Sequence, residues 1–288
     1  MTSKPIEAID HLLTYVRDLD AAASLFHRMG FTLSPISHIE AMGISNHLVL
    51  MRPAGPGHAN YIELMSASDR SRLPPAMART LSGNEGIKSM VLAARDAAAA
   101  QQAMQGLGFE AAPPVHVKRE WVIGPGQSVF PEFDVILPFP AALTFNCCQY
   151  HNVDLYLRPD WLEHPNGALG IRSVLAVAAD PASIVDKFAA LFKAPVDAGD
   201  GTASTRAGGV NLAIFTPAAA RKQFGIETAA PQVDAAYLGY RIDVRALDVL
   251  TSFLRKGDVP YRADADAVYV DPVSGLGNLM VFTENSGS

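Results

Sequence analysis

The sequence has little cysteine, little charge and no long apolar run, and each scarcity excludes a class of protein. The two cysteines, Cys147 and Cys148, are adjacent, which excludes the disulfide framework of small secreted domains. Charged residues make up 18% of the chain, and its net charge of −6 argues against nucleic-acid binding. Apolar runs are shorter than the roughly 20 residues of a membrane-spanning helix, and no signal-peptide core follows Met1. We therefore expect a cytoplasmic globular protein with a small-molecule partner, no nucleic acid and no membrane.

The N-terminal segment, as far as Met65, combines a strand, a helix and three more strands. Residues 8–16 are mostly apolar with polar interruptions, a pattern that predicts a strand. Asp18 or Asp20 can cap a helix over residues 21–29, and Gly30 is predicted to end it in a left-handed conformation. The later strands are predicted at residues 31–34, 47–51 and 60–65.

The same order of elements recurs along the chain. The dipeptides Arg17-Asp18 and Gly30-Phe31 return as Arg95-Asp96 and Gly108-Phe109, and both are displaced by the same offset. Third and fourth units start at Ile171 and near Leu238. One module leaves a sheet face uncovered, so modules should pair. The sequence therefore predicts an α+β protein of four βαβββ modules in two pairs, each pair forming a curled mixed sheet around a cavity.

The predicted boundary between the two pairs is a linker near residues 160–167. Residues 1–157 should form an N-terminal pair that contains the candidate site. Residues 168–288 should form a degenerate C-terminal pair, which lacks matching His and Glu ligands and has a structural or dimerising role. A homodimer is therefore one expected assembly.

Several motifs resemble those of the vicinal oxygen chelate superfamily, and more narrowly its glyoxalase-like-domain proteins. The resembling segments are Asp10-His11, Val16-Arg17-Asp18-Leu19-Asp20, Met29-Gly30-Phe31, Asn46-His47, Tyr61-Ile62-Glu63-Leu64, Cys148-Gln149-Tyr150-His151-Asn152, Arg158-Pro159 and Glu163-His164-Pro165-Asn166-Gly167-Ala168. This superfamily includes glyoxalase I, extradiol dioxygenases and bleomycin-binding proteins. The resemblance implies paired modules and a site completed from the partner module at the same two strand positions.

Two residues of the first module have the chemistry of metal ligands. His11 offers an imidazole and Glu63 a carboxylate, which suit a divalent Zn, Fe, Mn, Ni or Co ion. Alternate positions of a strand face one side, so single residues from several strands can converge. Ser89, the counterpart of His11, is a poor ligand, and Gln149 or His151 is expected to complete the site instead. In the structural alternative, His11 is a polar surface residue and His151 caps a loop.

Two functions remain open at this point. The first is a metal-dependent lyase, isomerase or dioxygenase that binds vicinal oxygens of a small substrate and acts as a Lewis acid, with Glu63 as ligand and base. The second is a non-catalytic protein of the bleomycin-resistance type that sequesters a small molecule without metal. In either case, the residues expected to contact the small molecule are Tyr15, His47, Tyr61, Met65 and Tyr150.

Overall fold

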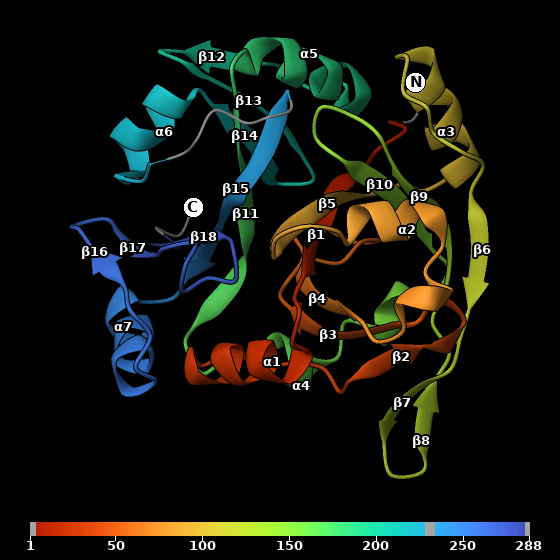
Figure 1. The fold of residues 1–288 in the computed structure, drawn as a ribbon, viewed down its shortest axis with the longest axis horizontal. Coiled ribbons are helices and arrows are strands. Elements are labelled where there is room, and N and C mark those ends of the chain that lie inside the picture. Colours follow the sequence, from red (N-terminus) through yellow and green to blue (C-terminus); the bar gives the residue numbers. More distant parts are fainter. Residues whose placement is uncertain (1–3, 228–233, 286–288) are drawn as a thin grey trace.

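The computed structural model describes residues 4–227 and 234–285, and two eight-stranded sheets dominate this part of the chain (Figure 1). The first sheet comprises β1 (Ala8–Tyr15), β2 (Ser37–Ile39), β3 (Ile44–Leu50), β4 (Tyr61–Ala67), β5 (Gly86–Ala93), β6 (Val115–Lys118), β9 (Glu132–Phe139) and β10 (Phe145–Tyr150). The second comprises β11 (Ala168–Ala178), β12 (Asp197–Gly199), β13 (Thr202–Ala207), β14 (Val210–Phe215), β15 (Ala235–Val244), β16 (Arg262–Ala263), β17 (Ala267–Val270) and β18 (Leu279–Glu284).

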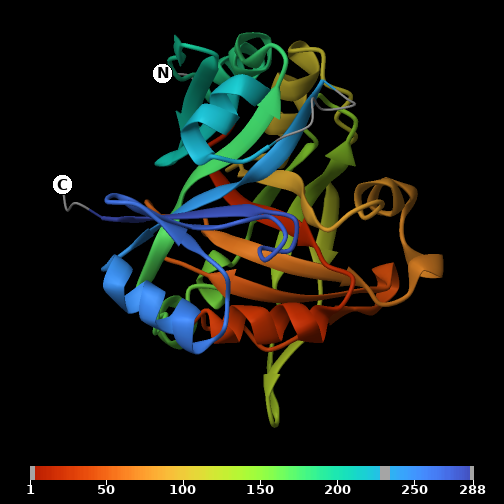
Figure 2. The same ribbon diagram turned by 60° about the vertical axis from the view of Figure 1, so that its left-hand side comes forward.

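The remaining elements are short. The helices are α1 (Leu19–Arg28), α2 (Pro75–Thr80), α3 (Ala97–Gly106), α4 (Pro159–Leu162), α5 (Pro181–Phe192), α6 (Pro217–Phe224) and α7 (Leu247–Lys256), with single 3-10 turns η1 (Glu40–Met42), η2 (Arg70–Arg72) and η3 (Val153–Leu155). Strands β7 (Trp121–Gly124) and β8 (Gln127–Val129) form a separate hairpin, which projects from the body in both ribbon views (Figures 1 and 2).

The two sheets have the same topology. Their strand orders are β2-β3-β4-β1-β5-β10-β9-β6 and β12-β13-β14-β11-β15-β18-β17-β16. In each sheet the first strands of two successive modules pair antiparallel at the centre, β1 with β5 and β11 with β15. Each central strand also pairs in parallel with the last strand of its own module. The predicted α+β fold of paired βαβββ modules is therefore confirmed.

The repeated Asp and Gly residues explain why the module helices begin and end where they do. The carboxylates of Asp18, Asp96 and Asp180 accept hydrogen bonds from backbone N–H groups three residues later, at 2.9, 2.9 and 3.3 Å. Gly30 and Gly108 follow α1 and α3, each with φ of +82°. This left-handed conformation confirms the expectation for Gly30.

Some predicted elements differ from the observed ones. Residues 31–34 form no strand, and the chain continues irregularly to β2. Pro35 has no backbone N–H for a ladder bond, and Ser34 instead bonds to Leu48 through both its backbone N–H and its hydroxyl. Helices α2 and α6 were not among the elements predicted from the sequence.

One apolar core joins the two sheets. Its fully buried members include Leu12 of β1 and Met90 of β5 from the first sheet, and Val174 of β11 and Tyr240 of β15 from the second. Backbone and side chains also bond across the boundary, and Tyr237 donates to the Thr144 carbonyl oxygen at 2.6 Å. Helices α1 and α7 lie side by side at one end of the molecule (Figure 2). Among the described residues, no helix has the length and apolarity needed to cross a membrane.

Candidate functional site

One face of the first sheet lines a cavity with a mostly apolar wall and a cluster of polar groups. The wall includes Leu13, Leu48, Met65, Val91, Phe133 and Val135. The polar lining consists of His11, Asn46, Tyr61, Glu63, Arg119, Asn146, Tyr150 and Tyr156. Most of these positions alternate along β1, β3, β4, β9 and β10, as expected for side chains on one face of a pleated sheet. The arrangement suits a small molecule with an apolar body and a polar head.

His11 is held at the cavity by its neighbour Asp10. The Asp10 carboxylate is buried and accepts a hydrogen bond from His11 Nδ1 at 2.6 Å. It also accepts bonds from the Ala59 backbone N–H at 2.7 Å and from the Tyr150 hydroxyl at 2.9 Å. Because a carboxylate only accepts, the proton of neutral His11 lies on Nδ1 and the lone pair on Nε2. The basic nitrogen therefore points at the other polar groups of the cavity.

Glu63 lies opposite that nitrogen. Its Oε2 atom is 3.7 Å from His11 Nε2, and its Oε1 atom accepts a 2.5 Å bond from the Asn46 side-chain amide. Glu63 is 9% exposed, so its charge has lost most of its contact with water. A buried carboxylate is costly without compensation, and here the Asn46 amide supplies one hydrogen bond while Oε2 has none among the described residues.

Two tyrosines complete this polar cluster. The Tyr61 ring stacks on His11 at a centroid distance of 4.0 Å, and its hydroxyl lies 3.2 Å from His11 Nε2 and 3.1 Å from the Tyr150 hydroxyl. Burial, together with the nearby carboxylates of Glu63 and Asp10, raises the pKa of Tyr61 well above its usual value. Burial and Asp10 likewise raise the pKa of Tyr150. Both hydroxyls therefore stay protonated and can donate hydrogen bonds.

Five of the residues singled out in the sequence meet in this cavity: His11, Tyr61, Glu63, Met65 and Tyr150. Their convergence follows from the register of β1 and β4, in which His11 pairs with Tyr61 and Leu13 with Glu63. These five side chains line one cavity although they come from three strands, β1, β4 and β10.

Gln149 and His151 lie on the opposite face of the sheet, which corrects their expected place beside His11 and Glu63. Cavity-facing positions of β10 are Asn146, Cys148 and Tyr150, so the residues between and after them point away. The Gln149 side chain accepts a 2.8 Å bond from the Ala97 backbone N–H at the start of α3. His151 instead contacts Asp134 at 2.9 Å.

His47 and Tyr15 also lie outside the cavity lining. On β3, Asn46 and Leu48 face the cavity, and the His47 ring bonds through Nδ1 to the Ser34 carbonyl oxygen at 2.8 Å. Tyr15 is buried beyond the end of the cavity, in an apolar cluster with Met65, and its hydroxyl accepts a 2.5 Å bond from Arg70. Strand alternation points the His47 side chain away from the cavity. Tyr15 is the last residue of β1 and lies beyond the cavity lining.

The true counterpart of Glu63 in the second module is Asn146. Leu13 pairs with Glu63 in the first module, and Val91, which follows Leu13 at the same offset as Ser89 follows His11, pairs with Asn146 in the second. Ser89, the counterpart of His11, donates a 2.6 Å bond to Asn146 Oδ1. The second module therefore contributes neutral groups where the first contributes an imidazole and a carboxylate.

Two contributors to the site, Asp10 and Arg119, were not expected from the sequence. Asp10 was visible only as the residue before His11. Arg119 lies between β6 and β7, and its Nη1 donates a 2.5 Å bond to Ser37 while its guanidinium lies over the Trp121 ring. Its Nε is buried and has no bonding partner. Nothing in the local sequence pattern marks it as a cavity residue.

The donor set of the cavity fits a divalent metal ion. His11 Nε2 and Glu63 Oε2 face each other at 3.7 Å, and a buried carboxylate orients the imidazole through its other nitrogen, as is usual for histidine ligands. Asn46 Oδ1 is buried without a hydrogen-bond partner, which makes it a neutral oxygen donor in need of one. Imidazole with carboxylate and amide oxygens suits ions from Mn²⁺ to Zn²⁺.

Comparisons with known proteins agree with this fold. A structure of a hypothetical protein from Staphylococcus aureus has a TM-score of 0.65 and 13% identity, over 96% of this chain and 98% of the other. A mutant of 4-hydroxymandelate synthase from Streptomyces coelicolor gives 0.58 and 12%, over 99% and 94%. The Mn(II)-bound glyoxalase from Novosphingobium aromaticivorans gives 0.56 and 15%, over 97% and 82%. At these identities the likeness shows the fold alone.

The sequence itself identifies the family. No curated protein sequence matches the chain. The model of the glyoxalase-like domain family, however, matches residues 9–192, a range that includes nearly the whole first sheet and the first strand and helix of the second half. Because this match extends over more than half of the 288 residues, the chain belongs to the glyoxalase-like domain family.

Proposed function

We propose that the protein is a metal-dependent enzyme that acts on a small, largely apolar substrate carrying vicinal oxygens. The observation that carries this proposal is the convergence of His11 Nε2 and Glu63 Oε2 at 3.7 Å within a mostly apolar cavity. His11, Glu63 and Asn46 would hold the ion. When bound, such an ion polarises substrate oxygens and stabilises negative charge that develops on them.

The residues of the cavity have separable tasks in this reaction. Asp10 fixes the His11 ring and its tautomer through the 2.6 Å bond to Nδ1. Glu63 carries the one carboxylate of the described cavity lining, so it is the candidate that takes a proton from the substrate. The protonated Tyr61 hydroxyl can donate a hydrogen bond to a substrate oxygen, whereas the Tyr150 hydroxyl donates its proton to Asp10.

Arg119 would favour a substrate that carries a negative charge. It is a cation in the cavity lining, and its buried Nε donor has no partner. An unpaired buried donor costs free energy that a substrate carboxylate or carbonyl oxygen would recover. The apolar wall near Leu48, Phe133 and Val135 would contact the rest of the molecule. A short organic acid with an adjacent oxygen fits both surfaces.

Calorimetric titration with Mn²⁺, Zn²⁺ and Ni²⁺ tests the proposal. We expect Glu63→Gln to lose a binding event that the unaltered protein shows, because the amide keeps the shape of the side chain but removes its charge. His47→Gln is the matched control, since His47 lies on the adjoining strand outside the cavity lining. Equal metal binding by the unaltered protein and by Glu63→Gln would refute a metal centre in this cavity.

The mostly apolar wall favours a second candidate, a protein that sequesters a small molecule without metal. This alternative predicts ligand binding that is independent of added metal. It also predicts that Glu63→Gln stabilises the fold, because a buried carboxylate is removed. Thermal unfolding of the two proteins, recorded alongside the titrations, therefore separates the two functions.

A further inference from the structure

A second cluster of metal-binding side chains lies on the face of the first sheet opposite the cavity. Strands β6, β9 and β10 are neighbours, with β6 at the edge. Their cavity-facing residues include Val117, Phe133, Val135 and Tyr150. Strand alternation therefore sends the intervening residues His116, Asp134 and His151 outward together. His116 and Asp134 are direct cross-strand partners.

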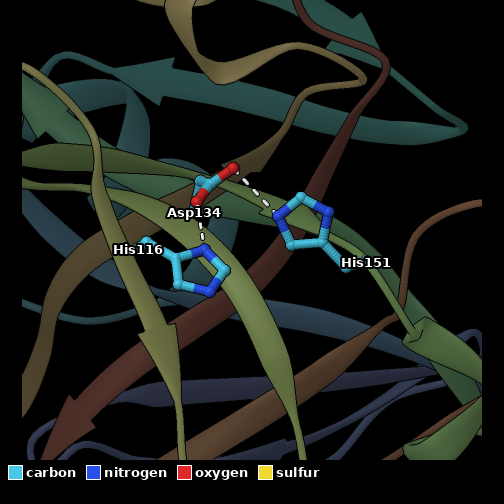
Figure 3. A group of neighbouring side chains, drawn as sticks. All are labelled: His116, Asp134 and His151. Atoms are coloured by element: carbon cyan, nitrogen blue, oxygen red, sulfur yellow. Dashed lines mark hydrogen bonds and ion pairs between the residues drawn. The ribbon is translucent and has the colours of Figure 1, made fainter.

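These three side chains already converge. Figure 3 shows Asp134 between the two imidazole rings, with one carboxylate oxygen toward each. His116 Nδ1 lies 2.8 Å from Asp134 Oδ1, and His151 Nε2 lies 2.9 Å from Asp134 Oδ2. One ligand atom from each of the three residues lies within 4.8 Å of the others. Within the described residues, no other group of three His, Cys, Asp or Glu side chains meets that condition.

We propose that His116, Asp134 and His151 form a second metal site, for a divalent ion of the zinc class. Two imidazoles and one carboxylate are ligands that such ions prefer, and three protein ligands leave a position for water. The side chains of His116, Asp134 and His151 are 55%, 26% and 35% exposed, so the ion can enter from solvent.

Binding requires a rearrangement of the ring protons and a small movement of the side chains, because ligand atoms lie about 2.0 to 2.2 Å from a bound zinc ion. In the neutral state each ring donates its proton to Asp134, so the nitrogen that faces the carboxylate is blocked. Moving each proton to the other ring nitrogen frees His116 Nδ1 and His151 Nε2 to coordinate the ion together with an Asp134 oxygen. His116 Nε2 would then carry the proton and face the Glu132 carboxylate, whose Oε1 atom lies 3.7 Å away, within ion-pair distance.

The charge around the cluster also favours a cation. Asp134 and Glu132 supply two negative charges, and Lys118 offsets one of them through its 2.7 Å contact with Glu132 Oε2. With neutral imidazoles the group keeps a net negative charge. A bound ion would fasten the edge strand β6 to β9 and β10, which line the cavity with their other faces. This site is independent of the proposed function.

Titration of Zn²⁺ alone into the metal-stripped full chain at pH 7.5 tests the proposal. We expect His116→Ala and His151→Ala each to lose one zinc-binding event per chain relative to the unaltered protein. Glu132→Gln should weaken that event by about 10-fold, because it leaves the three ligands in place but removes a negative charge beside His116. His27→Ala is the matched control, since His27 is an exposed histidine on α1, away from the cluster.

Comparison with Glu63→Gln keeps this site distinct from the cavity. The zinc-binding event that His116→Ala loses should persist in Glu63→Gln. If both sites bind zinc, the double variant that combines Glu63→Gln with His116→Ala should lose both binding events. Added Zn²⁺ should also raise the midpoint of thermal unfolding of Glu63→Gln but not that of the double variant. Identical zinc isotherms for the unaltered protein and His116→Ala would overturn the proposal and leave the cluster as a hydrogen-bonded bridge between strands.

Discussion

Replacing either of two equivalent glycines with alanine should separate the cost of backbone strain from the cost of crowding. Gly30 and Gly108 end the helices of the first two modules, and both have φ of +82°. A Cβ atom on Gly30 would lie 2.7 Å from the Phe253 ring of α7 and 2.9 Å from Asn166 Cβ. A Cβ atom on Gly108 would meet nothing within 4 Å. Only Gly30 therefore faces both penalties.

The magnitudes follow from this difference. An alanine held in the left-handed region costs about 1 to 2 kcal/mol, and this term applies at both positions. Overpacking a tight contact adds about 1 to 3 kcal/mol, and this term applies at Gly30 alone. We expect Gly108→Ala to lower the free energy of unfolding by about 1 to 2 kcal/mol and Gly30→Ala to lower it by about 2 to 5 kcal/mol.

Urea unfolding followed by far-UV circular dichroism measures both variants against the unaltered protein. The cost of the left-handed backbone is common to Gly30→Ala and Gly108→Ala. The difference between their losses in free energy of unfolding therefore reports the crowding of residue 30 against Phe253 and Asn166. A Phe253→Ala background should recover part of the Gly30→Ala cost, since it removes the nearest ring. Equal losses for Gly30→Ala and Gly108→Ala would refute the packing argument.

Two further predictions concern buried polar groups. Asp10→Asn should weaken metal binding in the cavity by about 10- to 100-fold, because the hydrogen bond that orients His11 loses its charged acceptor. Calorimetric titration measures the affinity, and an unchanged affinity would contradict the role of Asp10. His164 is buried, with Nδ1 accepting from the Thr32 N–H and Nε2 bonded to the Leu50 carbonyl oxygen, and burial lowers its pKa to about 4. In the unfolded chain this imidazole binds its proton near pH 6.5. The free energy of unfolding should therefore be highest above pH 6.5 and should fall by up to about 3 kcal/mol as the pH drops toward 4. Urea unfolding at several pH values measures this slope, which His164→Gln should lack.

The repeated architecture was predictable because its signals are local. An aspartate that caps a helix and a glycine that ends it act within one turn, so their recurrence reveals the modules without tertiary information. His11 and Glu63 were also within reach, since a strand-borne histidine and an acid in an apolar strand are unusual side chains. Their meeting depends only on the alternation and register of β1 and β4.

The contribution of the second module to the site was not predictable in the same way. Cys148 and Tyr150 face the cavity while Gln149 and His151 face outward, and residues of both sets are polar, so the alternation on β10 gives no clear inner face. The offset from Glu63 to Asn146 is longer than the one from His11 to Ser89, because the second module is longer than the first. Polar pattern and chain offset therefore both pointed to the wrong residues.

The apolar core that both sheets share has a consequence for how the molecule unfolds. Stability is cooperative when the same contacts support several elements, and regions with their own core tend to open separately. Here fully buried residues of β1, β5, β11 and β15 pack in a single cluster. Amide hydrogen exchange should therefore show the central strands of both halves opening together. Substitutions in the core of the second sheet, far from His11 and Glu63, should therefore also raise the frequency at which the strands around the cavity open.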